Sequence, residues 1–109
     1  MTIKRVWHGW TTLDNANRYQ NILLNEVIPG IEAKSIPGLL KFEVLRLDLP
    51  DEVEFVTIIS FNSLQDVVAF QGEEYKKAYV PDAAREVLER WDLEIPHYEL
   101  VETRKYQES

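Results

Sequence analysis

His8 is the side chain of this sequence that is best suited to proton transfer near neutral pH. It lies between Trp7 and Trp10 in a Trp-His-Gly-Trp segment. A neutral imidazole can accept the proton of a phenol or an enol. Loss of that proton raises the electron density of the ring, as a cofactor-free reaction with oxygen requires. The alternative, which stays open, is a buried imidazole that is hydrogen-bonded to a carbonyl group or a carboxylate.

Four aromatic side chains are candidates for the walls of a binding site: Trp10, Phe70, Tyr75 and Trp91. Tyr75 precedes Tyr79 by four residues, so the two tyrosines share a face if this segment is helical. Such walls would suit a small apolar or aromatic ligand. The alternative for each residue is ordinary packing between helices and a sheet, with the hydroxyl groups reaching solvent.

Composition excludes most other chemistries. The chain has no cysteine, which removes disulfides, thiolate zinc sites, iron–sulfur clusters and cysteine nucleophiles. His8 and His97 are two neutral ligands and do not make a metal site alone, so we expect no metal. Phosphate-binding and dinucleotide-binding glycine motifs are absent. The net charge of −7 and the lack of a basic run argue against nucleic acid as a partner.

The pattern of elements predicts one domain over residues 1–109, with a core at about 3–102 and a polar tail at 103–109. We expect strands at residues 3–10, 39–49, 53–61 and 97–101. Helical stripes start at Leu13 (to be ended or distorted by Pro29-Gly30), at Ser63 (up to Gly72) and at Pro81 (up to Trp91). This order predicts an α+β, ferredoxin-like βαββαβ fold with an antiparallel sheet and helices on one face.

Two expectations concern surroundings and partners. No apolar stretch approaches the length of a membrane helix, and the N-terminus lacks the apolar core of a signal peptide, so we expect a cytoplasmic protein without a membrane partner. Strand 53–61 carries large apolar residues on both faces, whereas helices can cover only one. We therefore expect a homodimer in which sheet packs on sheet. The alternative is a monomer with a few exposed aromatic residues.

Four segments together resemble the antibiotic biosynthesis monooxygenase family of small dimeric α/β barrels. They are HGWTT at residues 8–12, the IPG turn at 36–38, DEVEFVTIISFNSLQDVVAFQG at 51–72 and EYKKAYVPDAAREVL at 74–88. The resemblance implies a pocket between the sheet and the helices of each subunit. It also implies catalysis without flavin or metal, in which the substrate supplies the electrons.

The resemblance also implies residue roles. Quinone-forming members place Asn, Trp and Tyr around a phenolic substrate, and the tyrosines of residues 75–79 are the match, so Tyr79 joins His8 as a catalytic candidate. Haem-degrading members use an Asn, a Trp and a ligating His, where this chain has His8, Phe70 and Tyr79. Because the ligating position has no imidazole, we do not expect haem. We expect no other cofactor either.

Three functions are compatible with these observations. The first is a cofactor-independent monooxygenase that acts on a small aromatic or polyketide-like molecule. The second is a non-catalytic dimeric barrel that binds a small apolar ligand, and the third is a structural domain with a filled interior. The interior separates them: an open pocket with His8 pointing into it favours the enzyme, and a packed interior favours the structural domain.

Overall fold

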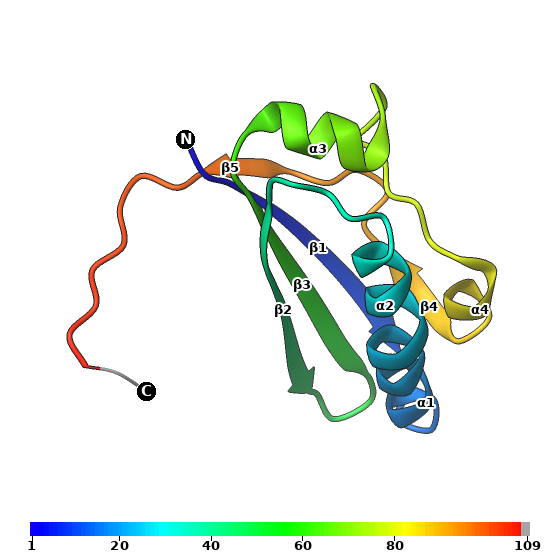
Figure 1. The fold of residues 1–109 in the computed structure, drawn as a ribbon. Coiled ribbons are helices and arrows are strands. Elements are labelled where there is room, and N and C mark those ends of the chain that lie inside the picture. The colour runs from blue at the N-terminus through cyan, green and yellow to red at the C-terminus, as the bar shows by residue number, and fades with distance from the viewer. Residues whose placement is uncertain (108–109) are drawn as a thin grey trace.

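A five-stranded sheet with helices on one face organises residues 1–107, the part of the chain that the computed structural model describes (Figure 1). The strands are β1 (Ile3–Thr11), β2 (Leu39–Asp48), β3 (Val53–Phe61), β4 (Leu88–Trp91) and β5 (His97–Glu99). Their order is β2-β3-β1-β4, and β5 pairs with the other end of β1. These pairings are antiparallel, so the predicted α+β, ferredoxin-like fold is confirmed.

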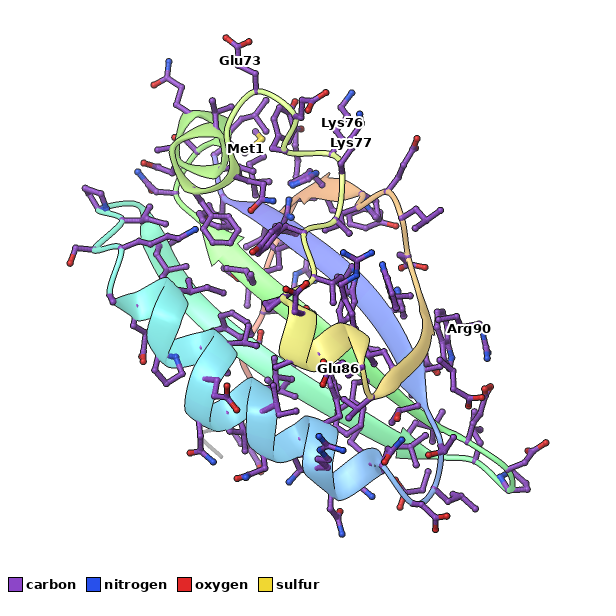
Figure 2. All side chains as sticks on the ribbon, turned by 90° about the vertical axis from the view of Figure 1, so that its right-hand side faces the viewer. Met1, Glu73, Lys76, Lys77, Glu86 and Arg90 are labelled. Carbon is purple, nitrogen blue, oxygen red and sulfur yellow. The ribbon has the colours of Figure 1, made fainter. Side chains whose placement is uncertain are left out.

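The helices lie together over one face of the sheet, as Figure 2 shows. We call this covered face the inner face and the opposite one the outer face. They are α1 (Ala16–Ile22), η1 (Leu23–Val27), α2 (Ile28–Glu32), α3 (Leu64–Gln71) and α4 (Asp82–Arg85). Buried apolar side chains of the sheet, Phe55 and Phe61 among them, pack beneath this layer. In residues 1–107 no helix has both the length and the apolar character needed to cross a membrane.

The first helical rod runs through α1, η1 and α2 without a break in its helical backbone. The π-helical turn η1 is closed by the bond from the Ile28 N–H to the Leu23 carbonyl. Pro29 follows at once, near the first position of α2, where its missing N–H costs little. The predicted distortion at Pro29-Gly30 is thus a widened turn just before the proline, and the helix continues to Glu32.

Helix α3 begins and ends where its sequence predicts. The Ser63 hydroxyl accepts a hydrogen bond from the Asp66 N–H at 3.3 Å, and it donates to the Asp66 carboxylate at 2.8 Å. Gly72 ends the helix at φ 91°, in the left-handed region that favours glycine.

The prediction of a helix over residues 81–91 is wrong in its second half. Only α4 is helical there, and Leu88–Trp91 forms β4 against the end of β1, with Gly9 opposite Trp91. The order apolar, polar, polar, apolar in Leu88 to Trp91 suits a helical stripe, and it suits a strand only with the register shift that β4 has opposite Trp10 and Thr11. Pairing with the edge of β1 decides for the strand. The segment of Tyr75 and Tyr79 is a turn rather than a helix, so these two residues share no helical face.

Candidate functional site

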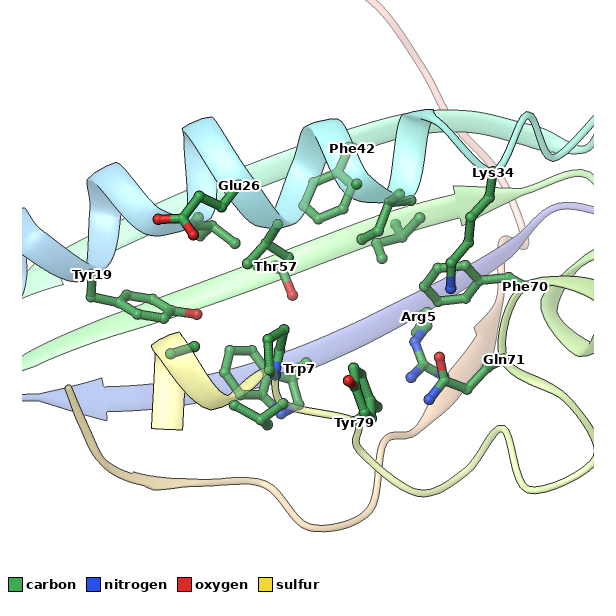
Figure 3. Close-up of a pocket in the computed structure, with 18 residues that line it drawn as sticks. Arg5, Trp7, Tyr19, Glu26, Lys34, Phe42, Thr57, Phe70, Gln71 and Tyr79 are labelled. Atoms are coloured by element: carbon green, nitrogen blue, oxygen red, sulfur yellow. The ribbon is translucent and has the colours of Figure 1, made fainter. Parts of the chain in front are cut away.

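A cavity of about 300 Å³ lies between the helices and the inner face of the sheet (Figure 3). This volume is at the lower end of the range for small-molecule sites. Its walls are mostly apolar and are drawn from β1, β2, β3, the first helical rod, α3 and the segment before α4. The lining includes Arg5, Trp7, Tyr19, Glu26, Thr57 and Phe70.

The alternation of side chains along β1 and β3 determines which residues form the floor of the cavity. Along β1 the side chains of Arg5 and Trp7 point to the inner face and are buried. Trp7 pairs with Thr57 of β3, whose side chain is also on this face. The Trp7 indole N–H donates to the Asp92 carbonyl at 3.2 Å, and its ring lies over Gly9, where a Cβ would come within 2.6 Å of it. The glycine of the HGW motif therefore makes room for a ring that lines the cavity.

The first helical rod supplies the opposite wall. Tyr19, Leu23, Glu26, Gly30 and Lys34 all line the cavity, at steps of three and four residues. The π turn adds a residue to one turn of this helix. Such turns occur often at functional sites, because they change which side chains face the partner surface.

Arg5 is the charged group of the cavity floor. It is 5% exposed, and burial lowers its pKa to about 10. Its Nη1 donates to the Tyr75 carbonyl at 2.6 Å and lies 3.0 Å from Nε2 of His97. Within residues 1–107 no carboxylate forms an ion pair with it. Arg5 is thus a buried cation held by neutral partners.

His97 holds Arg5 as a hydrogen-bond acceptor. A guanidinium can only donate, so Nε2 of His97 must be unprotonated. Burial, with the neighbouring charge of Arg5, lowers the pKa of His97 to about 4, which keeps the ring neutral. The Tyr75 ring packs edge-on against it, with centroids 5.0 Å apart. His97 and Tyr75 therefore hold the guanidinium in place, so His97 has a structural role here.

The two ends of the cavity differ in charge. Figure 3 shows Tyr19 and Glu26 at one end, and Lys34, Phe70, Arg5 and Gln71 at the other. Both cations lie against Phe70: the Arg5 guanidinium is 5.5 Å from the ring centroid, and Lys34 Nζ is 5.0 Å from it. A ligand in the cavity would therefore meet a positive end and an opposite end that carries a carboxylate.

Tyr19 is a hydroxyl donor at the other end. It is 2% exposed, and burial raises the pKa of its hydroxyl, which stays protonated. The edge of its ring packs on Phe55. Figure 3 shows its hydroxyl directed into the cavity, towards Thr57.

The exposed residues among those that line the cavity mark the position of its mouth. Glu26, Gly30 and Lys34 are exposed on the helical side, and Tyr79 is 74% exposed on the facing loop. The cavity therefore opens between the first helical rod and the loop that carries Tyr79.

Comparisons with known proteins bear on the fold. No protein-family model matches the sequence, and no curated protein matches it either. A proposed antibiotic biosynthesis monooxygenase from Bacillus cereus matches over 100% of both chains, with a TM-score of 0.68 and 14% identity. Another, from Nitrosomonas europaea, has a TM-score of 0.62 and 14% identity over 92% of this chain and 90% of that one. A third, from Chloroflexus aurantiacus J-10-fl, has a TM-score of 0.58 and 19% identity over 96% and 98%.

The chain has the antibiotic biosynthesis monooxygenase fold. The resemblance carried by the four sequence segments is confirmed at the level of the fold. In this fold the cavity lies between the sheet and the helices, as the resemblance implied. Identities of 14% to 19% carry no activity or substrate to this chain.

Within this fold, the candidate ligand-contacting residues are dispersed. Phe70 is a buried wall of the cavity, and Tyr79 stands at its mouth. Tyr75 lines a second hollow of about 540 Å³ together with His97. Trp91 packs against the hydrophobic core and Trp10 lies on the outer face of the sheet, and neither lines the cavity. The structure thus brings together two of the candidates, Phe70 and Tyr79.

His8 lies on the outer face of the sheet, so the expectation that it points into the cavity under the helices is wrong. Its Nδ1 is 2.8 Å from Oδ2 of Asp92, and its Nε2 is 4.0 Å from Oε2 of Glu54. Its ring stacks near Trp10, with centroids 6.1 Å apart. Parity along β1 is the reason: His8 follows Trp7 by one residue, and Trp7 points inward.

Sequence reasoning missed Arg5 as a cavity residue, and it also missed Tyr19, Glu26 and Lys34. A signal was present, because alternation along residues 3–10 places Arg5 on the same strand face as Trp7. A charged residue on the face of a buried tryptophan marks a site that needs a partner. In residues 1–107 no cluster of three or more His, Cys, Asp or Glu side chains could hold a metal ion.

Proposed function

We propose that this protein binds a small phenolic aromatic molecule in the cavity beneath its helices and oxygenates it with molecular oxygen, without a cofactor. The cavity itself carries the proposal. It has aromatic walls and buried polar groups, and it opens at one side. A purely structural domain would have a filled interior, whereas the lining residues of this chain enclose an open cavity.

The proposed reaction converts a phenol with an unsubstituted para carbon into a quinone. One atom of O₂ becomes the new carbonyl oxygen on that carbon, and the other leaves as water. The water takes the phenolic hydrogen and the ring hydrogen, so atoms balance. The ring supplies the electrons that reduce O₂, and no further reductant is needed.

The residues of the cavity would position the substrate and exclude water. Trp7 and Phe70 offer flat apolar surfaces to the ring, and the buried Tyr19 hydroxyl offers a hydrogen bond. Glu26 lines the exposed mouth and gives the end of the cavity near Tyr19 a negative charge. His8 takes no part, because it lies on the opposite face.

A second copy of the chain is the proposed partner. The outer sheet face carries Val6 and Trp10 of β1, Val56 and Ile58 of β3, and Leu45 and Leu47 of β2. Leu45 and Leu47 are 50% and 53% exposed. Apolar side chains on three adjacent strands form a continuous face, which a matching face would bury.

Blocking the mouth tests the function. Gly30 lines the cavity from α2, and a Cβ there would meet nothing within 4 Å, so the helix accepts a side chain. Gly30→Leu should therefore fold but obstruct the cavity. We expect quenching of tryptophan fluorescence by 1-naphthol, and oxygen uptake with it, to fall at least about tenfold.

Gly30→Ala is the matched control. It stabilises the helix by about 0.5–1 kcal/mol and leaves the cavity open, so binding and oxygen uptake should stay at the wild-type level. Unchanged binding in Gly30→Leu would show that the ligand does not use this cavity. Binding without oxygen uptake in the wild type would leave a binding protein and remove the oxygenase.

A further inference from the structure

Arg5 carries a positive charge into the apolar cavity without an acidic partner. The residue is 5% exposed, and its hydrogen-bond partners are a backbone carbonyl and a neutral imidazole. Desolvating a cation is costly unless an opposite charge or full hydrogen bonding compensates. Both contacts use Nη1, so compensation from residues 1–107 is partial.

The remaining donors of Arg5 form a fork. Nε carries one N–H and Nη2 carries two, and none has a partner among residues 1–107. The Nε–H and one Nη2–H point the same way, which suits an oxygen atom with high electron density. Arg5 lines the cavity, and Figure 3 shows its guanidinium beside Gln71 and near Phe70.

We propose that Arg5 binds the ring oxygen of the phenolic ligand as the phenolate anion and so holds the substrate in its oxygen-reactive form. This inference rests on the proposed function and specifies its ligand and its anion-binding residue. Ionisation breaks the phenolic O–H bond, the electron pair stays on the oxygen beside Arg5, and the proton passes to solvent at the mouth. Without Arg5 the apolar floor would instead favour the neutral phenol, because Lys34, the other cation of this end, is exposed to solvent at the mouth.

Charge within the cavity sets the orientation of the ligand. The phenolate would lie at the end formed by Arg5 and Lys34, away from the Glu26 carboxylate at the other end (Figure 3). The ring would then lie between Trp7 and Phe70, with its para carbon towards Tyr19. His97 is a positioning residue here, because its Nε2 fixes Nη1 and leaves the fork to the ligand.

A coloured phenol tests the inference by the sign of a spectral change. The probe is 4-nitrophenol, whose anion absorbs at longer wavelength than its neutral form, at a pH about one unit below its own pKa. On binding to the wild type, the anion band should grow. On binding to Arg5→Met, which removes the charge and keeps an apolar chain, the anion band should shrink. We expect the ratio of bound anion to bound phenol to differ at least about tenfold between the two proteins.

Three further measurements keep the result interpretable. 4-Nitroanisole, which cannot ionise, reports occupancy of the cavity alone and should bind both proteins alike. Lys4→Met removes a charge from the neighbouring position on the outer side of β1, and it should leave the spectral change at the wild-type level. Arg5→Lys keeps the charge but loses the fork, and it should give an intermediate anion band. This variant carries the test if Arg5→Met does not fold.

The outcomes separate the two proposals. Growth of the anion band in the wild type and its loss in Arg5→Met support the inference. Binding of both probes to the wild type with a shrinking anion band, or an anion band unchanged by both Arg5 substitutions, overturns the role of Arg5 and leaves the cavity as a binding site. Failure of both probes to bind the wild type contradicts the proposed function itself.

Discussion

The two faces of β1 present two clusters built from similar side chains. On the inner face, Arg5 meets His97 under the helices, beside an apolar cavity. On the outer face, His8 meets Asp92 and has Glu54 nearby, with 34% of its side chain exposed. The inner cluster is a cation among neutral groups, whereas the outer cluster is an imidazole among acids.

The surroundings of the two clusters indicate which of them can bind a ligand. The outer imidazole already has a carboxylate at 2.8 Å, so the side chains nearby satisfy it. The inner guanidinium has unused donors and is buried, and the attraction between an anion and a cation is stronger in a buried site than in water. In the sequence, a histidine between two aromatic residues is the better candidate for chemistry, yet the arginine with unused donors lies three residues earlier, on the opposite face of β1.

The largest expected effect concerns the partner of the outer face. Leu45→Glu places a charge on the apolar face of β2 that a second copy would bury. The variant should fold and run at the mass of one chain in light scattering at micromolar concentration, where the wild type runs as a dimer. Leu13→Glu, at a site that is 53% exposed outside the sheet, should remain dimeric. A wild type at the mass of one chain would rule out the dimer.

The next effect is a dependence of folding stability on pH, which arises from His97 on the inner face. The pKa of His97 is about 4 in the folded protein and returns to its ordinary value of 6.5 on unfolding. The unfolded chain therefore binds more protons between these values, and stability is lost as the pH falls through this window. His97→Gln offers Arg5 an acceptor that cannot be protonated. Its melting temperature should fall less than that of the wild type between pH 7 and pH 4.

Parallel melting curves of the two proteins over this range check the prediction. The carboxylates of the two proteins are the same and contribute equally to the pH dependence of the melting temperature. The difference between the curves therefore isolates the contribution of His97. Coincident curves would show that the ring does not stay neutral beside Arg5.

The smallest effect is expected on the outer face. His8→Ala removes the contact with Asp92 and should cost about 1 kcal/mol in the free energy of unfolding. Probe binding and oxygen uptake should stay within about threefold of the wild type, because His8 does not line the cavity. Loss of turnover of about 100-fold or more in a folded variant would return His8 to the mechanism.

Local signals predicted most of the elements. Strand 53–61 matches β3 at both ends, since alternating β-branched and aromatic residues favour extended structure. Ser63 and Gly72 predicted the two ends of α3, because caps act within one turn. The prediction of a helix from Leu88 to Trp91 was wrong, because a partner strand distant in sequence decides the conformation of this segment.

The order of residues along β1 is enough to place Arg5 and Trp7 on one face of the strand and His8 and Trp10 on the other. Side chains alternate along a strand whatever packs against it. Which face the helices cover, and therefore which residues line the cavity, depends on tertiary contacts. Both faces of this strand carry aromatic side chains, so either could have met the helices. The choice depends on contacts between segments far apart in the chain, such as those of Arg5 with Tyr75 and His97.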